Sequence, residues 1–386
     1  MGQNQSQKIL RDQFYHACEQ GNANQVREIL PRLTFESLNH LNEQTGCSPL
    51  FIACQNKHAE IVRILLEQKA CQRILPNRNG VQPFDSTEQE NIRLLFVRPC
   101  PNNEINNRFI DNSNDEQLAF RIVSDIQSTS ECPNNWLRGY SSVEQANDCQ
   151  LMIGLSQTSN PVLKRFISIR TEKESQQRVL LSIIVNIPIS NPHHQFSLYL
   201  YQQFLEKKLI EPLLTLYSLE TPLYRALQSD ADAYTLLLYL YLDQLKKRSF
   251  SGHAYRGATM TINDLDAYQW AKTNSAIIET RSLQSTSKDI DIAKGFSFLN
   301  PSNRNRSSVI LHFIFNQSCP TAIDLHGLSY FPNEQEILLL PLTLFKVISI
   351  EQVITNSFEQ YEITMENLPV PTKDIWKISR NISKNK

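Results

Sequence analysis

An internal repeat in the first hundred residues constrains the fold of this chain more than any other feature. Residues 17–30 align without gaps with residues 53–66, an offset of 36 positions. A second pair of segments, residues 46–50 (GCSPL) and 80–84 (GVQPF), lies 34 positions apart. A period near 33 residues predicts supersecondary units that bury their apolar faces only by stacking on one another.

The second unit shows how each repeat is built. Ser48 is placed to cap a helix whose first residue is Pro49, where the missing N–H is harmless. Ile61, Leu65 and Leu66 share one face of the next helix. Residues 48–53 (SPLFIA) resemble the T-P-L-H-x-A motif of ankyrin repeats.

The resemblance covers residues 8–98 as about three ankyrin repeats, with degenerate terminal ones. It implies an all-α array that binds a protein partner. A second interpretation stays open, in which so short an array only packs against its own neighbouring domain.

Composition excludes several classes of protein. With 386 residues, the chain has room for two to three domains of roughly 150 residues. A net charge of -1 removes the basic surface of a nucleic-acid binder, so no nucleic-acid partner is expected. The chain has only 10 glycines and no glycine-rich phosphate loop, so a nucleotide would have to be held in another way.

The N-terminus fits the N-myristoylation pattern M-G-x-x-x-[ST], which predicts lipidation at Gly2. A chance match in a polar terminus is the alternative, and the mass of the N-terminal peptide distinguishes the two. One acyl chain supports only weak membrane association. Without a secretory signal, we expect a cytoplasmic protein whose 8 cysteines are reduced thiols, with no metal-binding spacing.

The middle of the chain carries no motif for chemistry. Residues 99–115 are rich in Asn and Pro and predict a linker. Residues 116–195 form an unassigned α/β region, in which the apolar run 178–189 predicts a buried strand. His193 and His194 lie near prolines and predict a solvated loop. From residue 196 a helical pattern begins, with Leu200, Phe204 and Leu209 on one face and a longer helix at 231–245.

Three separated segments of the C-terminal half are suited to chemistry. The first is residues 255–257 (YRG), where Arg256 would be costly to bury without an anion. The second is residues 285–287 (STS). In the third, Glu334 and Glu336 open an apolar stretch, and strand alternation predicts that both face one side. Two carboxylates in one cleft can divide tasks, although E-x-E is also common on surfaces.

In this order, the segments resemble the R-S-E signature of arginine-specific mono-ADP-ribosyltransferases of the cholera-toxin-like branch. Residues 331–337 (FPNEQEI) resemble the family's E-x-E with its preceding loop, and residues 217–227 (YSLETPLYRAL) resemble the helical lead-in of animal members. The resemblance spans about residues 196–365 and predicts a transferase domain over 196–386. It implies an α+β fold with split mixed β-sheets, an N-terminal helical part, and NAD held by an arginine.

The resemblance also implies which residues bind NAD. Arg256 would hold the phosphate and ribose, with Tyr255 and Thr286 beside it. Gly257 would allow the cofactor to approach closely. Phe296 is a candidate to stack on nicotinamide, and a buried core phenylalanine is the alternative.

The catalytic roles are implied in the same way. Ser285 would position the nicotinamide ribose and Glu336. Glu336 would bond the ribose 2′-OH and stabilise the oxocarbenium-like state as nicotinamide leaves. Glu334 would orient an acceptor arginine, because a protonated guanidinium is a poor nucleophile without a carboxylate.

Together these features predict a glycosyltransferase that moves ADP-ribose from NAD, used as a substrate, to an arginine of an acceptor protein without a metal. Two alternatives are a non-catalytic, ankyrin-led scaffold with an NAD-binding fold, and an NAD glycohydrolase. Deletion of residues 8–98 is expected to change the acceptor range but not nicotinamide release.

Overall fold

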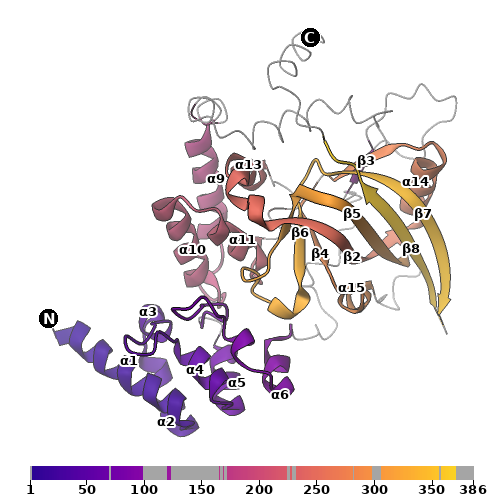
Figure 1. The fold of residues 1–386 in the computed structure, drawn as a ribbon. Helices are drawn as coiled ribbons and strands as arrows, with labels where there is room; N and C mark the ends of the chain where they lie inside the picture. The colour runs from indigo at the N-terminus through magenta and orange to yellow at the C-terminus, as the bar shows by residue number, and fades with distance from the viewer. Residues whose placement is uncertain are drawn as a thin grey trace. The chain divides into compact units, whose positions relative to one another are not determined.

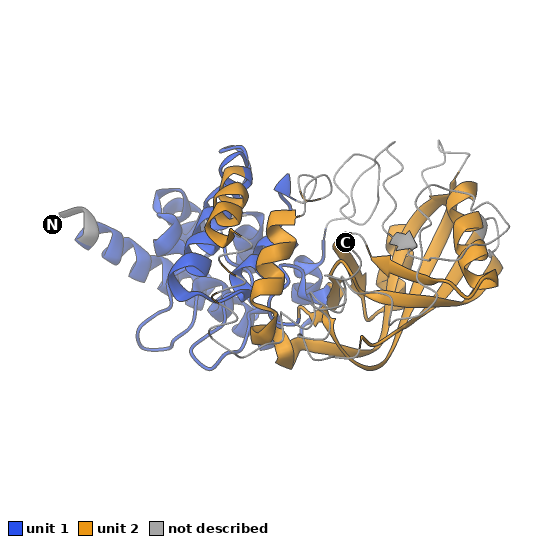
Figure 2. Cartoon of the chain, turned by 90° about the horizontal axis from the view of Figure 1, so that it is seen from above, with its two compact units in different colours: residues 1–100, 183–223, 326–333 blue, residues 101–182, 224–325, 334–386 orange. Residues whose placement is uncertain are grey.

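The computed structural model describes residues 2–68, 71–98, 120–122, 165, 168, 172–223, 227, 232–280, 282–297, 306–355 and 358–370 (Figure 1). Two compact units are assembled from interleaved parts of the chain (Figure 2). Unit 1 comprises residues 1–100, 183–223 and 326–333, and unit 2 comprises residues 101–182, 224–325 and 334–386. The predicted linker 99–115 and most of region 116–195 lie outside the described residues.

The N-terminal part of unit 1 is a series of helix pairs at the spacing of the repeat (Figure 1). The first pair is α1 (Gly2–Gln20) with α2 (Ala23–Ile29), and the second is α4 (Pro49–Gln55) with α5 (Ala59–Glu67). The third unit is shorter, with α6 (Glu90–Arg93) between the 3-10 turns η2 (Phe84–Ser86) and η3 (Leu94–Phe96). The turn η1 (Leu30–Arg32) and helix α3 (Phe35–Leu38) connect the first two pairs.

The second repeat folds as its sequence predicts. Ser48 Oγ accepts a hydrogen bond from the Phe51 backbone N–H at 3.1 Å, and Pro49 is the first residue of α4. Ile61 and Leu65 of α5 are buried, and Leu66 packs against the same core. This cap and this apolar face are therefore confirmed.

Two further helices complete unit 1. They are α10 (His194–Lys207) and α11 (Glu211–Ser218). The ring centroid of Phe35 in α3 lies 6.1 Å from that of Phe196 and 5.7 Å from that of Tyr199, both in α10. Because α10 packs on the array in this way, the predicted domain boundary at residue 196 is not a boundary between the units.

Three sequence-based expectations in this region are wrong. Residues 178–185 belong to helix α9 (Lys173–Val185), with Leu180 and Ile184 buried at helical spacing, rather than to a strand. His193 is buried, and its ring meets Tyr330 edge-on at a centroid distance of 4.9 Å, so it does not lie in a solvated loop. Leu209 is exposed because α10 ends before it.

Unit 2 is built on a mixed sheet. Among the described residues its strand order is β1-β3-β7-β8-β5-β2-β4-β6. The strands are β1 (Phe120–Ile122), β2 (Ser249–Thr261), β3 (Ile277–Thr280), β4 (Gln284–Ser287), β5 (Arg306–Asp324), β6 (Glu336–Leu339), β7 (Leu344–Thr355) and β8 (Phe358–Asn367). In this order β5 and β8 pair in parallel, and the other pairs are antiparallel. The predicted combination of an α+β mixed-sheet part and a helical repeat part is confirmed.

The junction between β2 and β4 is the narrowest in the sheet. A single register pair, Tyr255 opposite Ser287, joins these two strands. β6 pairs with β4 and also with residues 322–324 at the end of β5. The short strands β4 and β6 therefore form the end of the sheet, joined to the long strands by one pair to β2 and by the end of β5. They carry the STS motif and the second glutamate of the E-x-E motif.

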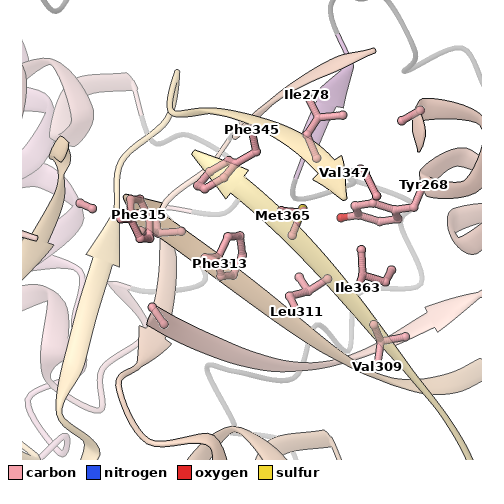
Figure 3. Close-up of a cluster of buried hydrophobic side chains, with 14 of the residues drawn as sticks. Tyr268, Ile278, Val309, Leu311, Phe313, Phe315, Phe345, Val347, Ile363 and Met365 are labelled. Atoms are coloured by element: carbon pink, nitrogen blue, oxygen red, sulfur yellow. The ribbon is translucent and has the colours of Figure 1, made fainter. Parts of the chain in front are cut away.

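Helices lie between the strands of unit 2 along the chain, and two of them pack on the sheet. They are α13 (Asp232–Leu240), α14 (Ile262–Thr273) and α15 (Ile290–Ser297), and the 3-10 segment η5 (Leu242–Arg248) replaces the end of the helix predicted at 231–245. Leu311, Phe313, Phe345 and Met365 point from the strands into a shared core with Tyr268 of α14 (Figure 3). Residues 224–226 of the predicted lead-in motif lie outside the described residues. No described helix has the length and apolar character of a membrane span.

Candidate functional site

The first candidate side chain is a buried arginine in β2. Arg256 is only 7% exposed, and its register partner across the sheet is Leu311 of the core. Its Nη1 donates a hydrogen bond to the carbonyl oxygen of Ser285 at 2.8 Å. Among the described residues Arg256 has no ion-pair partner. Because a buried guanidinium is unfavourable without a compensating charge, Arg256 is suited to bind an anionic ligand group.

The second and third candidates are joined directly. Ser285 Oγ in β4 donates a hydrogen bond to Glu336 Oε1 in β6 at 2.7 Å, and both side chains are 1% exposed. In the antiparallel register of β4 and β6, Ser287 lies directly opposite Glu336. Ser285, two residues away in β4, is therefore the diagonal neighbour of Glu336 and can reach its carboxylate. Arg256, Ser285 and Glu336 therefore form a hydrogen-bonded chain across three strands, although they lie 29 and 51 residues apart in sequence.

Glu334 lies in a turn, whereas the sequence predicts that it lies in the same strand as Glu336. It ends the 3-10 turn η6 (Pro332–Glu334), and β6 begins only at Glu336. Gln335 between them has a φ of 45°, in the left-handed region. Strand alternation therefore does not explain the placement of Glu334, because this residue interrupts the pleat before β6 begins. Both carboxylates are nevertheless buried, with the exposed Gln335 between them.

The backbone of Glu334 is instead held by β4. Ser287 Oγ donates to the Glu334 carbonyl oxygen at 2.7 Å, and the Lys288 backbone N–H donates to the Gln335 carbonyl oxygen at 3.2 Å. Glu334 is 2% exposed. β4 therefore fixes the Glu336 carboxylate through Ser285 and the Glu334 backbone through Ser287.

Two of the predicted NAD-binding residues have contacts within the sheet. The Thr286 hydroxyl donates to the Ile337 carbonyl oxygen at 2.8 Å and is buried, so it ties β4 to β6. Tyr255 is half-buried, and its ring stacks on His312 of β5 at a centroid distance of 4.7 Å. Because neighbours in a strand face opposite sides, Tyr255 lies on the other face of β2 from Arg256.

Gly257 and Phe296 meet around α15. A Cβ atom on Gly257 would lie 2.0 Å from the Ala293 carbonyl oxygen, so the close approach at this glycine is made by the backbone of α15. Helix packing by itself accounts for a glycine at this position, and the expected close approach of a cofactor stays a prediction. Phe296 in α15 is partly exposed rather than fully buried, and its contact with nicotinamide stays a prediction.

Ionisable groups around the site have displaced pKa values. Burial raises the pKa of Tyr268, more than the positive charge of Arg256 lowers it. Burial and the neighbouring His253 lower the pKa of His312, whereas Glu362 raises it. His253 Nδ1 lies 2.8 Å from His312 Nε2, so one of these nitrogens donates to the other. We expect His312 to be neutral near pH 7.

Sequence reasoning missed the positioning part of this site. Ser287 was included in the STS motif, but nothing local indicates that its hydroxyl bonds the Glu334 carbonyl 47 residues away. His312 lies between buried residues of a strand, and this alternation could have indicated that it faces away from the core. Gly2, the predicted lipidation site, is the first residue of α1, and its modification stays a prediction.

Residues 14–94 match the family model for ankyrin repeats in three copies. The helix pairs of unit 1 have the corresponding arrangement, so the predicted ankyrin array is confirmed over these residues. No curated protein matches the chain.

Several solved structures align with the chain at low TM-scores. The ADP-ribosyltransferase HopU1 of Pseudomonas syringae aligns at 17% identity over 38% of this chain and 66% of its own, with a TM-score of 0.29. The type III effector XopAI from Xanthomonas axonopodis aligns at 16% identity over 59% and 96%, with a TM-score of 0.36. Exoenzyme S from Pseudomonas aeruginosa, solved with 14-3-3 protein and carba-NAD, aligns at 16% identity over 49% and 88%, with a TM-score of 0.29. The activity of this chain therefore has to be inferred from its own residues.

Proposed function

We propose that this chain transfers ADP-ribose from NAD to an arginine side chain of an acceptor protein and releases nicotinamide. The observation that supports the proposal is the hydrogen-bonded chain from Arg256 through Ser285 to Glu336. It combines a buried cation for a phosphate group with a buried carboxylate whose orientation is fixed by a hydroxyl. The R-S-E order of these residues supports the same activity.

Glu336 would act on the bond that breaks. As the bond between ribose C1′ and the nicotinamide nitrogen breaks, its electron pair leaves with nicotinamide and positive charge develops on the ribose. A carboxylate already oriented by Ser285 stabilises such charge without reorganising during the reaction. Because Glu336 is 1% exposed, water screens this interaction only weakly.

Glu334 would act on the bond that forms. A guanidino nitrogen of the acceptor arginine bonds to C1′ and loses a proton, for which Glu334 is the proposed acceptor. Glu334 belongs to a separate turn and is tied to β4 through its own backbone. This separation supports a division of tasks, in which Glu336 serves NAD cleavage and Glu334 serves the acceptor.

The test uses the full chain with labelled NAD and either agmatine or an arginine-rich protein as acceptor. We expect transfer in the wild type, and loss of both nicotinamide release and transfer in Glu336→Gln. Glu334→Gln should retain nicotinamide release and lose transfer. Glu351→Gln, an exposed glutamate of β7 in the same unit, is the matched control and should behave as wild type.

Each alternative function has its own outcome in this experiment. Label transfer that survives in Glu336→Gln would refute the proposal. Nicotinamide release with water as the only acceptor would identify a glycohydrolase. Absence of both activities, together with retained binding of NAD, would favour a scaffold with an NAD-binding fold.

A further inference from the structure

The segment that immediately precedes Glu334 belongs to unit 1 rather than to the sheet unit. Residues 326–333 group with the ankyrin array and with helices α10 and α11, whereas Leu325 and Glu334 on either side belong to unit 2. The segment is joined by the peptide bond after Asn333 to Glu334, the carboxylate proposed to take the proton of the acceptor arginine. We call residues 326–333 the connecting segment.

Hydrogen bonds attach the connecting segment to unit 1 at two points. The Tyr330 backbone N–H donates to Ser218 Oγ, at the end of α11, at 2.8 Å. Gln82 Nε2 donates to the Gly327 carbonyl oxygen at 2.7 Å and to the Ile74 carbonyl oxygen at 3.1 Å. Both contacts fix backbone groups, so they restrain the path of the segment whatever its side chains do.

Two arginines hold the aromatic residues of the connecting segment. The Arg98 guanidinium carbon lies 3.7 Å from the ring centroid of Phe331. The Arg73 guanidinium carbon lies 4.8 Å from the centroid of Tyr330 and 5.2 Å from that of Phe331. Tyr330 and Phe331 are 3% and 1% exposed, so these cation–π contacts are shielded from water and correspondingly strong. Glu220 forms an ion pair with Arg98 at 2.8 Å, which fixes the guanidinium over the ring.

Gln82, Arg73 and Arg98 together hold the connecting segment, and we call them the clamp. They come from the degenerate end of the array. Gln82 occupies the position in the third repeat that Ser48 occupies in the second, 34 residues earlier. Ser48 caps its own helix, whereas Gln82 reaches the Gly327 carbonyl oxygen. Arg73 and Arg98 lie just before and just after this repeat. The third repeat therefore departs from the ankyrin pattern at the position where it binds the connecting segment.

We propose that Gln82, Arg73 and Arg98 restrain the connecting segment and thereby the backbone that leads into Glu334, the carboxylate of the acceptor step. This inference rests on the proposed function, because it assigns a task to the acceptor carboxylate of that reaction. Ser287 fixes the Glu334 carbonyl oxygen from β4, and the clamp fixes the residues on its other side. Glu336 is held separately by Ser285, so the clamp acts on transfer and not on NAD cleavage.

The test compares Gln82→Ala and Arg98→Met with Arg78→Met. Arg78 is an exposed arginine of the same repeat region, and its side chain donates to the Glu43 carbonyl oxygen rather than to the connecting segment. In the two clamp variants we expect transfer to agmatine to fall about tenfold, since small displacements of an orienting group are costly. Nicotinamide release without acceptor should stay within about twofold of wild type. Arg98→Lys keeps the charge but not the planar guanidinium, and should give an intermediate loss.

Hydrogen–deuterium exchange supplies a readout that does not depend on activity. We expect the amides of residues 326–336 to exchange faster in Gln82→Ala and Arg98→Met, and unchanged exchange in Arg78→Met. Unchanged exchange in the clamp variants, or an equal loss of nicotinamide release and transfer, would overturn the inference. An inactive wild type would refute the proposed function, and with it the assigned task. Faster exchange in the variants would then establish only that the third repeat holds the segment.

Discussion

Gly257 lacks a side chain at a place where the backbone of α15 occupies the space for one. A Cβ atom there would lie 2.0 Å from the Ala293 carbonyl oxygen and 2.7 Å from the Ser297 nitrogen. Backbone atoms cannot rotate away as the end of a flexible side chain can, so a larger residue has to displace the helix or the strand. This glycine therefore sets the distance between α15 and β2, one residue from Arg256.

We expect Gly257→Ala to lower the free energy of unfolding by about 1–3 kcal/mol, the usual range for overpacking. Gly295→Ala is the matched control, because nothing lies within 4 Å of a Cβ added at that position of α15. Alanine there should be neutral or stabilise the helix by up to about 1 kcal/mol. Urea denaturation followed by circular dichroism measures both variants. Equal stabilities would show that the close approach at Gly257 has no energetic effect.

At the scale of elements, β4 is a four-residue strand in which each of three hydroxyls fixes a different group. Ser285 bonds the Glu336 carboxylate, Thr286 the Ile337 carbonyl oxygen and Ser287 the Glu334 carbonyl oxygen. The outer two hydroxyls lie two residues apart, as side chains on one face of a strand do. This short strand thus holds both proposed catalytic glutamates. It binds Glu336 by the side-chain carboxylate and Glu334 by the backbone carbonyl oxygen.

The two outer hydroxyls should have separable effects on catalysis. Ser285→Ala should lower nicotinamide release by about 100-fold, a loss typical for removal of one preorganised hydrogen bond at a charged centre. Ser287→Ala should leave nicotinamide release nearly unchanged and lower transfer to agmatine, because it frees the turn that carries Glu334 and the Asp289 N–H but leaves the bond from Ser285 to Glu336 in place. Chromatography of nicotinamide and mass spectrometry of the agmatine product measure the two steps. An equal loss of nicotinamide release in both variants would contradict the assignment.

Elements that depend on near neighbours could be predicted from the sequence, and those that depend on distant contacts could not. The Ser48 cap and the face of α5 were predictable because their determinants lie within one helical turn. The apolar run at residues 178–185 is compatible with a strand or a helix, and only packing decides between them. The left-handed backbone conformation of Gln335 could not be predicted either. It depends on the hydrogen bonds from β4 to Glu334 and Glu336, and nothing in the local sequence indicates these bonds.

For the candidate site, too, the residues could be predicted from local sequence but their contacts could not. Arg256, Ser285 and Glu336 could be selected because each stands in a motif that fits the chemistry. Their connection could not be deduced, because it depends on the pairing of strands that are 29 and 51 residues apart. The contribution of the third repeat was also missed, because its departure from the ankyrin pattern looked like degeneracy rather than a contact with residues 326–333.

At the scale of the whole molecule, the array is not an appendage that can be removed without consequence. Unit 1 combines the first hundred residues with residues 183–223 and 326–333 in one compact body (Figure 2). Phe35 of the array packs on Phe196 of α10, and Arg73 packs on Tyr330. The expectation that deletion of residues 8–98 changes only the acceptor range therefore has to be revised.

We expect a chain lacking residues 8–98 to lose transfer completely and to lose part of its nicotinamide release. The deletion exposes Phe196, Tyr330 and Phe331, three aromatic residues that are at most 3% exposed in the full chain. Exposed apolar surface of this kind promotes aggregation, and the connecting segment loses the residues that position Glu334. A chain lacking only residues 2–5 is the control, since the described side chain among these residues, that of Gln5, is exposed. Hydrogen–deuterium exchange over residues 183–223 and 326–333, with both activities measured in parallel, decides the question. Retained protection of these segments and normal transfer in the deleted chain would show that they fold independently of the array.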